Sequence, residues 1–258
     1  MSRSALLNGR ILSDAGIVGG RALLLSGARI EALADPADPR CAGAERIDLG
    51  GRLLLPGFID VQVNGGGGVL FNDHPSLESL RAIGAAHRRF GTTGWLPTLI
   101  SDEISVIERA FGAVQSAVDS GMPGVLGIHL EGPFINPVRR GIHEPRNLRR
   151  LARDALPLLT GLRGGRTVVT LAPEMAAPDM IAELAAAGVL VSAGHSAAGF
   201  AETTAAIAAG VRGFTHLFNG MPRLEPRAPG IVGAALDDQE TWCGIIVDGH
   251  HVDPVVLK

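Results

Sequence analysis

The sequence has few of the residues that mark secreted domains or nucleic-acid-binding proteins. Its two cysteines, Cys41 and Cys243, lie far apart and form no CxxC pair, which argues against a disulfide framework and against a thiolate zinc site. We expect both to be reduced thiols in a cytoplasmic protein. The basic residues form only one short cluster and the net charge is −3, so no surface suits the phosphate backbone of a nucleic acid.

Long apolar runs are also missing, as are the phosphate-binding P-loop and the serine nucleophile motif of hydrolases. Gly, Pro and charged residues interrupt every apolar run before the roughly 18 residues that a membrane span requires. The glycine run Gly65–Gly68 lacks the Lys-Ser/Thr ending of a P-loop, and no Gly-x-Ser-x-Gly nucleophile motif occurs. We therefore expect a soluble protein without nucleic-acid or membrane partners that acts on a small molecule.

What the sequence does contain predicts an α/β protein with two parts. Hydrophobic residues make up 46% of the 258 residues, enough to bury a large core. Between Ala5 and Ile47, short apolar runs alternate with Gly and Asp/Pro turns, a pattern typical of hairpins. From Arg52 onward, buried strands alternate with helical stretches, which indicates a parallel sheet. We predict a small β-rich domain over residues 1–51 and a (β/α) barrel over residues 52–258.

Seven strands are predicted in the second domain, with helices between them. The expected strands are Leu53–Val63, Gly94–Ile100, Val125–Glu131, Thr167–Ala172, Val189–His195, Gly213–Phe218 and Trp242–Val247. The expected helices are Leu77–Arg89, Ile104–Asp119, Asp179–Ala187 (between Pro178 and Gly188) and Ala197–Ala209. Barrels of this type close at eight strands, and Val252–Lys258 can only begin the next helix. We therefore expect the eighth strand to be absent and the chain to be truncated.

Three polar residues at predicted strand ends form a candidate metal site. Glu131, His195 and His216 come from three separate strands, and strand carboxyl ends form the active-site mouth of such a barrel. Each alone is more simply a polar residue satisfied by backbone groups, but three at matching strand ends favour a shared metal. One carboxylate and two imidazoles suit a single divalent ion, zinc first and iron as the alternative.

Six blocks along the chain carry a resemblance to a known family through their order and spacing. They are Leu55–Gly65, Gly91–Gly94, His129–Phe134, Ala193–His195, Thr215–Asn219 and Val247–His251. Together they resemble the N-acetylglucosamine-6-phosphate deacetylases of the amidohydrolase superfamily. The resemblance implies a TIM-like barrel of the metal-dependent hydrolase type. It also implies hydrolysis of N-acetylglucosamine 6-phosphate to glucosamine 6-phosphate and acetate.

At the end of the first predicted strand the sequence departs from most of that superfamily. The usual His-x-His pair, which binds a second metal, is replaced here by Gln62 and Asn64. Because amides are poor ligands for that position, the departure resembles the single-metal branch of the deacetylases and implies one metal ion. Gln62 and Asn64 are then remnants of the second site, or they hydrogen-bond at the barrel mouth.

The resemblance also assigns residues that contact the substrate. His143, in the loop Arg140–His143, falls where the family has a histidine that polarises the acetyl carbonyl, and Ile142 would contact the sugar. The phosphate-handling positions, which suit a dianion, match Asn219, Gly220 and Arg227, and His251 would join them. Read without the family, His143 and Arg227 are solvated loop residues. The Arg227 loop resembles one that reaches a neighbouring subunit, which implies a homodimer or higher homo-oligomer.

One catalytic residue of the family has no counterpart here. The resemblance implies a metal that lowers the pKa of its bound water and a strand-eight aspartate that acts as general acid/base. Asp248 lies on the seventh predicted strand and Asp60 within the first, so neither matches that aspartate. If 258 residues are the whole protein, we expect at most trace activity.

Three other functions stay open. The chain is alternatively a deacetylase of another phosphosugar, such as a galactosamine phosphate, because a metal site alone does not select a substrate. A cyclic-amide hydrolase usually retains the His-x-His pair and often a modified lysine, whereas the only lysine here is Lys258. A non-catalytic sugar-phosphate- or metal-binding protein is the third alternative, because the strand-eight aspartate is missing.

Overall fold

The computed structural model describes residues 2–258, and the chain divides into two compact units, Met1–Gly57 and Phe58–Lys258. The first unit contains two small sheets. Four strands pair in the order β5-β4-β1-β6, namely β1 (Arg3–Leu7), β4 (Ala22–Ser26), β5 (Arg29–Ala34) and β6 (Glu45–Asp48). The second sheet has the order β3-β2-β7, from β2 (Arg10–Ser13), β3 (Gly16–Val18) and β7 (Leu53–Leu54). The short helix α1 (Pro39–Ala42) adds Cys41 to a core of alanine and leucine side chains.

The hairpins expected at the N-terminus are present, but the first strand of the second unit begins later than expected. β2 pairs with β3, and β4 with β5, in antiparallel hairpins. Leu53 and Leu54, expected in the barrel, instead pair with Arg10 and Ile11 of β2. Pro56 follows them and has no N–H to donate to a ladder, so a single strand from Leu53 to Val63 is interrupted there.

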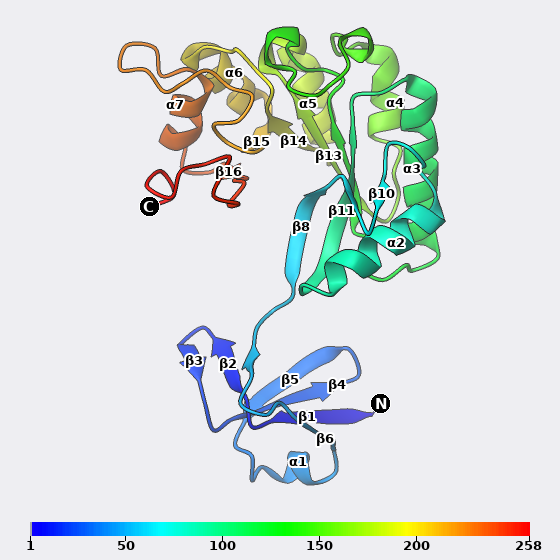
Figure 1. Ribbon diagram of the computed structural model, residues 1–258, viewed down its shortest axis with the longest axis vertical. Helices are drawn as coiled ribbons and strands as arrows, with labels where there is room; N and C mark the ends of the chain where they lie inside the picture. Colours follow the sequence, from blue (N-terminus) through cyan, green and yellow to red (C-terminus); the bar gives the residue numbers. More distant parts are fainter. Residues whose placement is uncertain (1) are drawn as a thin grey trace. The chain divides into compact units, whose positions relative to one another are not determined.

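The second unit is a curved parallel sheet with helices on its outer side (Figure 1). Its seven strands are β8 (Phe58–Val63), β11 (Thr92–Ile100), β12 (Gly127–Glu131), β13 (Arg166–Leu171), β14 (Leu190–Ala193), β15 (Val211–Phe214) and β16 (Trp242–Cys243). They neighbour one another in chain order, and every pair is parallel. β8 and β16 are the edges, so the sheet forms part of a TIM-like barrel. Seven parallel strands are present as predicted, but the last one, expected over Trp242–Val247, ends at Cys243.

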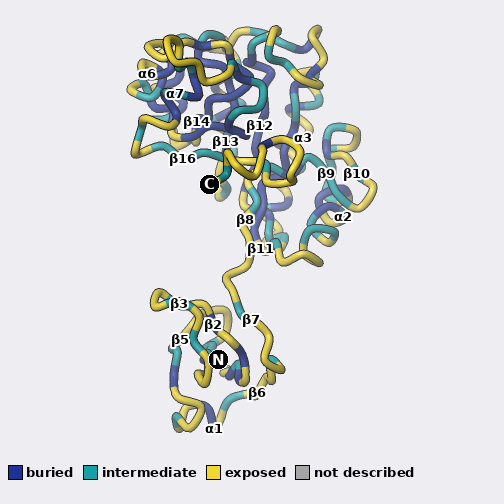
Figure 2. The backbone as a smooth tube through the Cα atoms, turned by 60° about the vertical axis from the view of Figure 1, so that its left-hand side comes forward, coloured by how far each residue is buried: buried dark blue, intermediate teal, exposed yellow. Residues whose placement is uncertain are grey.

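Helices connect the strands. They are α2 (Leu77–Arg88), α3 (Ile104–Asp119), α4 (Leu156–Leu159), α5 (Pro178–Ala186), α6 (Phe200–Ala209) and α7 (Gly230–Asp237). Four of them, α2, α3, α5 and α6, lie where the sequence predicts helices, whereas α4 and α7 were not predicted. In α3 the buried positions Ile107, Ala110, Phe111 and Val114 recur at helical spacing, so one face packs on the sheet and the other faces water. Figure 2 shows this division, with buried strands inside and exposed backbone on the outer helices. No helix within residues 2–258 combines the length and apolarity needed to cross a membrane.

The Gly65–Gly68 run forms a tight hairpin between β9 (Gly65–Gly66) and β10 (Val69–Leu70). Its backbone packs against α2, where Nε2 of His87 lies 2.9 Å from the carbonyl oxygen of Gly65. This close approach agrees with the interpretation that the glycines serve backbone packing rather than phosphate binding.

Gly127 is required where β12 begins. It pairs with Arg166 of β13, and a Cβ built on it would overlap the backbone of that residue at a φ of +151°. We expect Gly127→Ala to lower the free energy of unfolding by about 1–3 kcal/mol, because backbone atoms cannot move aside as a flexible side chain can. The measurement is chemical denaturation.

Gly112→Ala is the matched control, because Gly112 lies within α3 and a Cβ there meets nothing within 4 Å. Replacing a helical glycine by alanine is expected to stabilise the fold by about 0.5–1 kcal/mol. Equal effects of the two substitutions would contradict the steric argument.

Candidate metal centre

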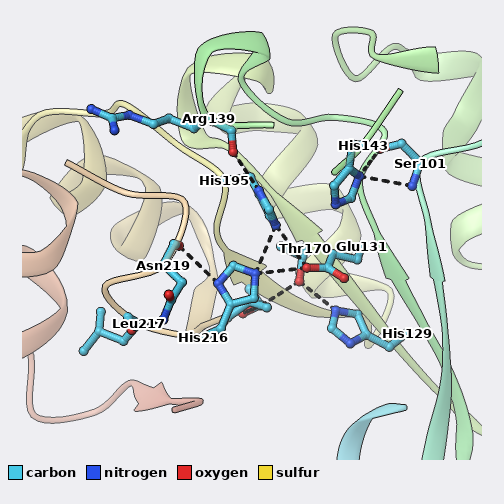
Figure 3. Close-up of polar contacts among 12 residues, drawn as sticks. Ser101, His129, Glu131, Arg139, His143, Thr170, His195, His216, Leu217 and Asn219 are labelled. Atoms are coloured by element: carbon cyan, nitrogen blue, oxygen red, sulfur yellow. Dashed lines mark hydrogen bonds and ion pairs between the residues drawn. The ribbon is translucent and has the colours of Figure 1, made fainter. Parts of the chain in front are cut away.

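Three strand ends bring Glu131, His195 and His216 together (Figure 3). Glu131 is the last residue of β12, and the two histidines each lie two residues beyond a strand, β14 and β15. Their residues are 4%, 7% and 7% exposed. The predicted strands Val189–His195 and Gly213–Phe218 therefore end early, at Ala193 and Phe214.

The early strand ends have a backbone cause. His195 has φ +47° and His216 has φ +37°, in the left-handed region that strands do not use. Such a conformation costs roughly 1–3 kcal/mol and persists only where surrounding contacts hold it. Turning the backbone at these two positions directs both imidazoles toward Glu131.

The ligand atoms meet at one point. Oε1 of Glu131 lies 3.1 Å from Nε2 of His195 and 3.0 Å from Nε2 of His216, and the two Nε2 atoms are 3.0 Å apart. The Nδ1 atoms face backbone carbonyls, Arg139 O at 2.8 Å from His195 and Asn219 O at 3.1 Å from His216. A carbonyl only accepts, so each Nδ1 carries a proton, and in its neutral form each ring presents an Nε2 lone pair to the other. Two facing lone pairs beside a carboxylate are a donor set that fits a divalent cation.

The charges at the centre agree with that fit. Burial raises the pKa of Glu131, but the close contacts of its carboxylate with the His195 and His216 rings outweigh burial and hold the pKa well below its usual range. Burial lowers the pKa of His195, but the hydrogen bond and charge of Glu131 outweigh it and leave that pKa raised. The buried carboxylate is thus ionised and attracts positive charge, which a metal ion supplies.

A glycine allows the loop after β15 to pack on the His195 ring. Gly220 has φ +64°, and a Cβ there would lie 3.0 Å from Nδ1 of His195. The residue therefore has a steric role beside His195. It also accepts a hydrogen bond from the backbone N–H of Ser196 at 3.1 Å, which ties the two ligand-bearing loops together.

His143 lies next to this group in a fixed protonation form. It is 1% exposed, and its ring centroid is 4.7 Å from that of His195. Its Nδ1 accepts from the backbone N–H of Ser101 at 3.3 Å, and Ser101 Oγ lies 2.7 Å away. A nitrogen that accepts holds no proton, so the ring proton is on Nε2. Burial lowers the pKa of His143 to about 4, which leaves a neutral hydrogen-bond donor.

A chain of buried hydroxyl groups lies beside the candidate metal site, and the sequence interpretation did not include it. Nδ1 of His129 donates to Val61 O at 2.9 Å, so its Nε2 accepts from Thr170 Oγ1 at 2.7 Å. Thr215 Oγ1 lies 2.6 Å from that of Thr170 and 2.7 Å from Ser192 Oγ. The chain crosses neighbouring strands and satisfies polar groups that would otherwise be buried unpaired.

A model of the Amidohydrolase family matches residues 53–258, which is most of the chain. The chain belongs to the Amidohydrolase family. That family is metal-dependent, in keeping with the Glu131, His195 and His216 group.

Relatives of this amidohydrolase include named deacetylases. It is 49% identical over 202 residues to an N-acetylgalactosamine-6-phosphate deacetylase of Shewanella sp. (strain ANA-3), covering 78% of this chain and 51% of the relative. It is 39% identical to an N-acetylglucosamine-6-phosphate deacetylase of Bos taurus, covering 86% of this chain and 57% of the relative. A solved deacetylase from Mycobacterium smegmatis in complex with N-acetyl-D-glucosamine-6-phosphate has a TM-score of 0.89 and 32% identity, covering 99% of this chain and 66% of that one. This amidohydrolase thus spans about half to two thirds of their length.

The residues predicted to contact a substrate lie in varied settings in this amidohydrolase. Ile142 is 83% exposed and Arg227 is exposed on the loop after β15. His251 is exposed and its Nδ1 lies 2.6 Å from Oδ2 of Asp248. Asn219 is half-buried, and its backbone carbonyl orients His216. Within residues 2–258, no hydrogen bond joins Ile142, Arg227 or His251 to Glu131, His195 or His216.

Proposed function

We propose that this chain carries the metal centre and substrate-contacting residues of a deacetylase. The enzyme would hydrolyse the N-acetyl group of N-acetylglucosamine 6-phosphate to give glucosamine 6-phosphate and acetate. The convergence of Glu131, His195 and His216 beside a neutral His143 carries the proposal. The Bos taurus and Mycobacterium smegmatis relatives support the substrate, although the chain covers only part of each.

Glu131, His195 and His216 would hold one divalent ion, zinc in preference to iron. When bound, the ion lowers the pKa of a water molecule and stabilises negative charge on oxygen. His143 would donate from Nε2–H to the acetyl carbonyl oxygen, where negative charge develops as the amide is attacked. Ser101 keeps the donor in that tautomer, because its N–H occupies Nδ1.

The proton of the water must reach the leaving amine, and two carboxylates of the chain are unsuited to carry it. Asp248 accepts from the N–H groups of His250 and His251 and pairs with the His251 ring. The hydrogen bonds from His251 and His250 hold the pKa of Asp248 below its usual range, which makes it a weak base. Asp60 accepts from the N–H of Gln62 within β8.

The exposed loops after β15 and β16 would bind the phosphate group. Arg227 offers a guanidinium, Asn219 and Gly220 offer an amide and backbone N–H, and His251 offers an imidazole, all of which suit a dianion. Ile142 would pack on the sugar. The exposure of Arg227 is compatible with a contact to the site of a second subunit in a homodimer or higher homo-oligomer. Catalysis of amino-sugar breakdown would take place in the cytoplasm.

The galactosamine epimer is the second candidate substrate. It is favoured by the 49% identity to the Shewanella N-acetylgalactosamine-6-phosphate deacetylase. The metal ligands and His143 act on the acetamide, which both epimers share, so the centre itself does not separate them.

The test is to load the chain with Zn²⁺ and measure calorimetric binding and acetate release for both epimers, with unphosphorylated N-acetylglucosamine as the control. We expect zinc-dependent binding of at least one phosphosugar and much weaker binding of the control. Binding without acetate release would favour the non-catalytic binding protein. If neither phosphosugar binds the zinc-loaded chain, the proposed function is wrong.

A further inference from the structure

Glu174 is a carboxylate outside the candidate metal centre, and its hydrogen-bond partners lie in the segments next to that centre. It lies in the 3₁₀ turn η4 (Pro173–Met175) directly after β13 and is half-buried. Its Oε1 accepts from Asn136 Nδ2 at 2.8 Å and from the backbone N–H of Ala197 at 2.6 Å. Its Oε2 accepts from Ser196 Oγ at 2.7 Å. Three neutral donors thus satisfy one carboxylate.

Both segments that Glu174 joins converge on the metal ligand His195. Ser196 and Ala197 directly follow that ligand in the chain. Asn136 donates from its backbone N–H to the carbonyl oxygen of His195 at 2.9 Å. It also begins the turn η1 (Pro137–Arg139), where the N–H of Arg139 donates to Asn136 O at 2.9 Å. The carbonyl of Arg139 in turn orients the His195 ring through Nδ1 at 2.8 Å.

The backbone conformation of His195 has to be held by contacts from neighbouring residues. His195 lies beyond the end of β14 with φ +47°, so the strand ladder does not hold it. A residue in this conformation relaxes unless its neighbours fix it. Glu174 fixes the backbone after the ligand and also the turn that carries the carbonyl partner of its ring.

We propose that Glu174 is a positioning residue that keeps His195 in the geometry for binding the metal. It acts through Ser196, Ala197 and Asn136 and does not itself ligate the metal. The proposal rests on the metal centre of the proposed function. Removal of its hydrogen bonds leaves the ligand set intact but less well ordered, so metal binding weakens.

The experiment compares Glu174→Ala with Glu174→Gln in the full chain. Affinity for Zn²⁺ is measured by competition with a chromophoric chelator, and the d–d absorption of bound Co²⁺ reports ligand geometry. We expect Glu174→Ala to weaken Zn²⁺ binding by about 10- to 100-fold, as loss of a partner outside the ligand shell does. The Co²⁺ spectrum should change as well.

Glu174→Gln tests whether hydrogen bonds or charge matter. The glutamine oxygen can still accept from Asn136 and Ala197, and its amide can donate to Ser196 Oγ. We therefore expect it to restore affinity close to that of the wild type. If Glu174→Gln weakens Zn²⁺ binding as much as Glu174→Ala does, the proposal that Glu174 positions His195 through these hydrogen bonds is wrong. Glu183→Ala is the matched control, because Glu183 is a carboxylate on α5 that pairs with Arg153 and should not affect the metal.

The outcomes separate this proposal from the proposed function. If the wild-type chain binds neither Zn²⁺ nor Co²⁺, the metal centre itself is wrong. If the wild type binds and Glu174→Ala binds with the same affinity and spectrum, Glu174 is not a positioning residue, even where the metal-free protein melts at a lower temperature. Should Glu174→Ala not fold, Ser196→Ala removes one of the three hydrogen bonds, and unchanged affinity there overturns the proposal.

Discussion

His216→Ala is expected to weaken Zn²⁺ binding by more than the roughly 100-fold that loss of an outer hydrogen-bond partner costs, because it removes a ligand atom itself. The remaining pair, Glu131 and His195, offers one oxygen and one nitrogen at 3.1 Å. Two ligands are fewer than the three that protein-bound zinc at a catalytic site uses. The measurement is competition with a chelator at neutral pH.

Thermal unfolding provides an independent measure of the same loss. A ligand that binds only the folded state at 100 times its Kd stabilises that state by about 2.7 kcal/mol. The wild-type chain should therefore melt at a higher temperature in zinc, and His216→Ala should not respond. His87→Ala is the control, since Nε2 of His87 contacts the carbonyl oxygen of Gly65 and His87 is not part of the Glu131, His195 and His216 group. This variant should keep the zinc-dependent shift. A shift retained in His216→Ala would mean that zinc binds elsewhere.

The parallel sheet was predictable because its signal is local. Each strand is a short apolar run followed by a helical stretch, and that alternation predicts parallel pairing. The hydropathy pattern does not report backbone torsion angles, and this explains why the ends of two strands were predicted too late. Nothing in the hydropathy around His195 or His216 indicates the positive φ that ends β14 and β15 before these residues. Leu53 and Leu54 were likewise apolar enough for either unit, and pairing with β2 decided between them.

The convergence of Glu131, His195 and His216 was predictable for a related reason, whereas the residues that support this group were not. Glu131 is an acidic residue at the end of a fully buried strand, which is conspicuous in sequence. Ser101 and Glu174 are ordinary polar residues in sequence, and the roles we propose for them rest on contacts across 42 and 22 positions, to His143 and Ser196. Such contacts depend on how loops fold over the strand ends. The position of Ser101 directly after a predicted strand was the one available signal.

His143→Ala should lower the rate of acetate release by about 100- to 1,000-fold, the cost of one lost donor to a developing oxyanion. Zinc affinity should stay close to that of the wild type, because His143 contacts the His195 ring but is not among the ligand atoms. If the chain releases acetate only slowly, polarisation of the carbonyl by His143 can still be measured. The readout is the ¹³C shift of the labelled acetyl carbonyl in bound N-acetylglucosamine 6-phosphate. A donor at Nε2 polarises that carbonyl, and the shift should be lost in the variant.

Ser101→Ala distinguishes a donor held in one tautomer from a histidine that only fills space. The substitution removes the hydroxyl 2.7 Å from Nδ1 but keeps the backbone N–H at 3.3 Å, so the ring should keep its place with a weaker hold on the tautomer. We expect a loss of rate smaller than that of His143→Ala, with the carbonyl shift reduced but present. If both variants retain the wild-type rate and shift, His143 does not polarise the substrate. The pKa of His143 is about 4, so its ring is neutral at a pH about two units or more above that value. The carbonyl shift of the wild type should therefore also be constant between about pH 6 and pH 8.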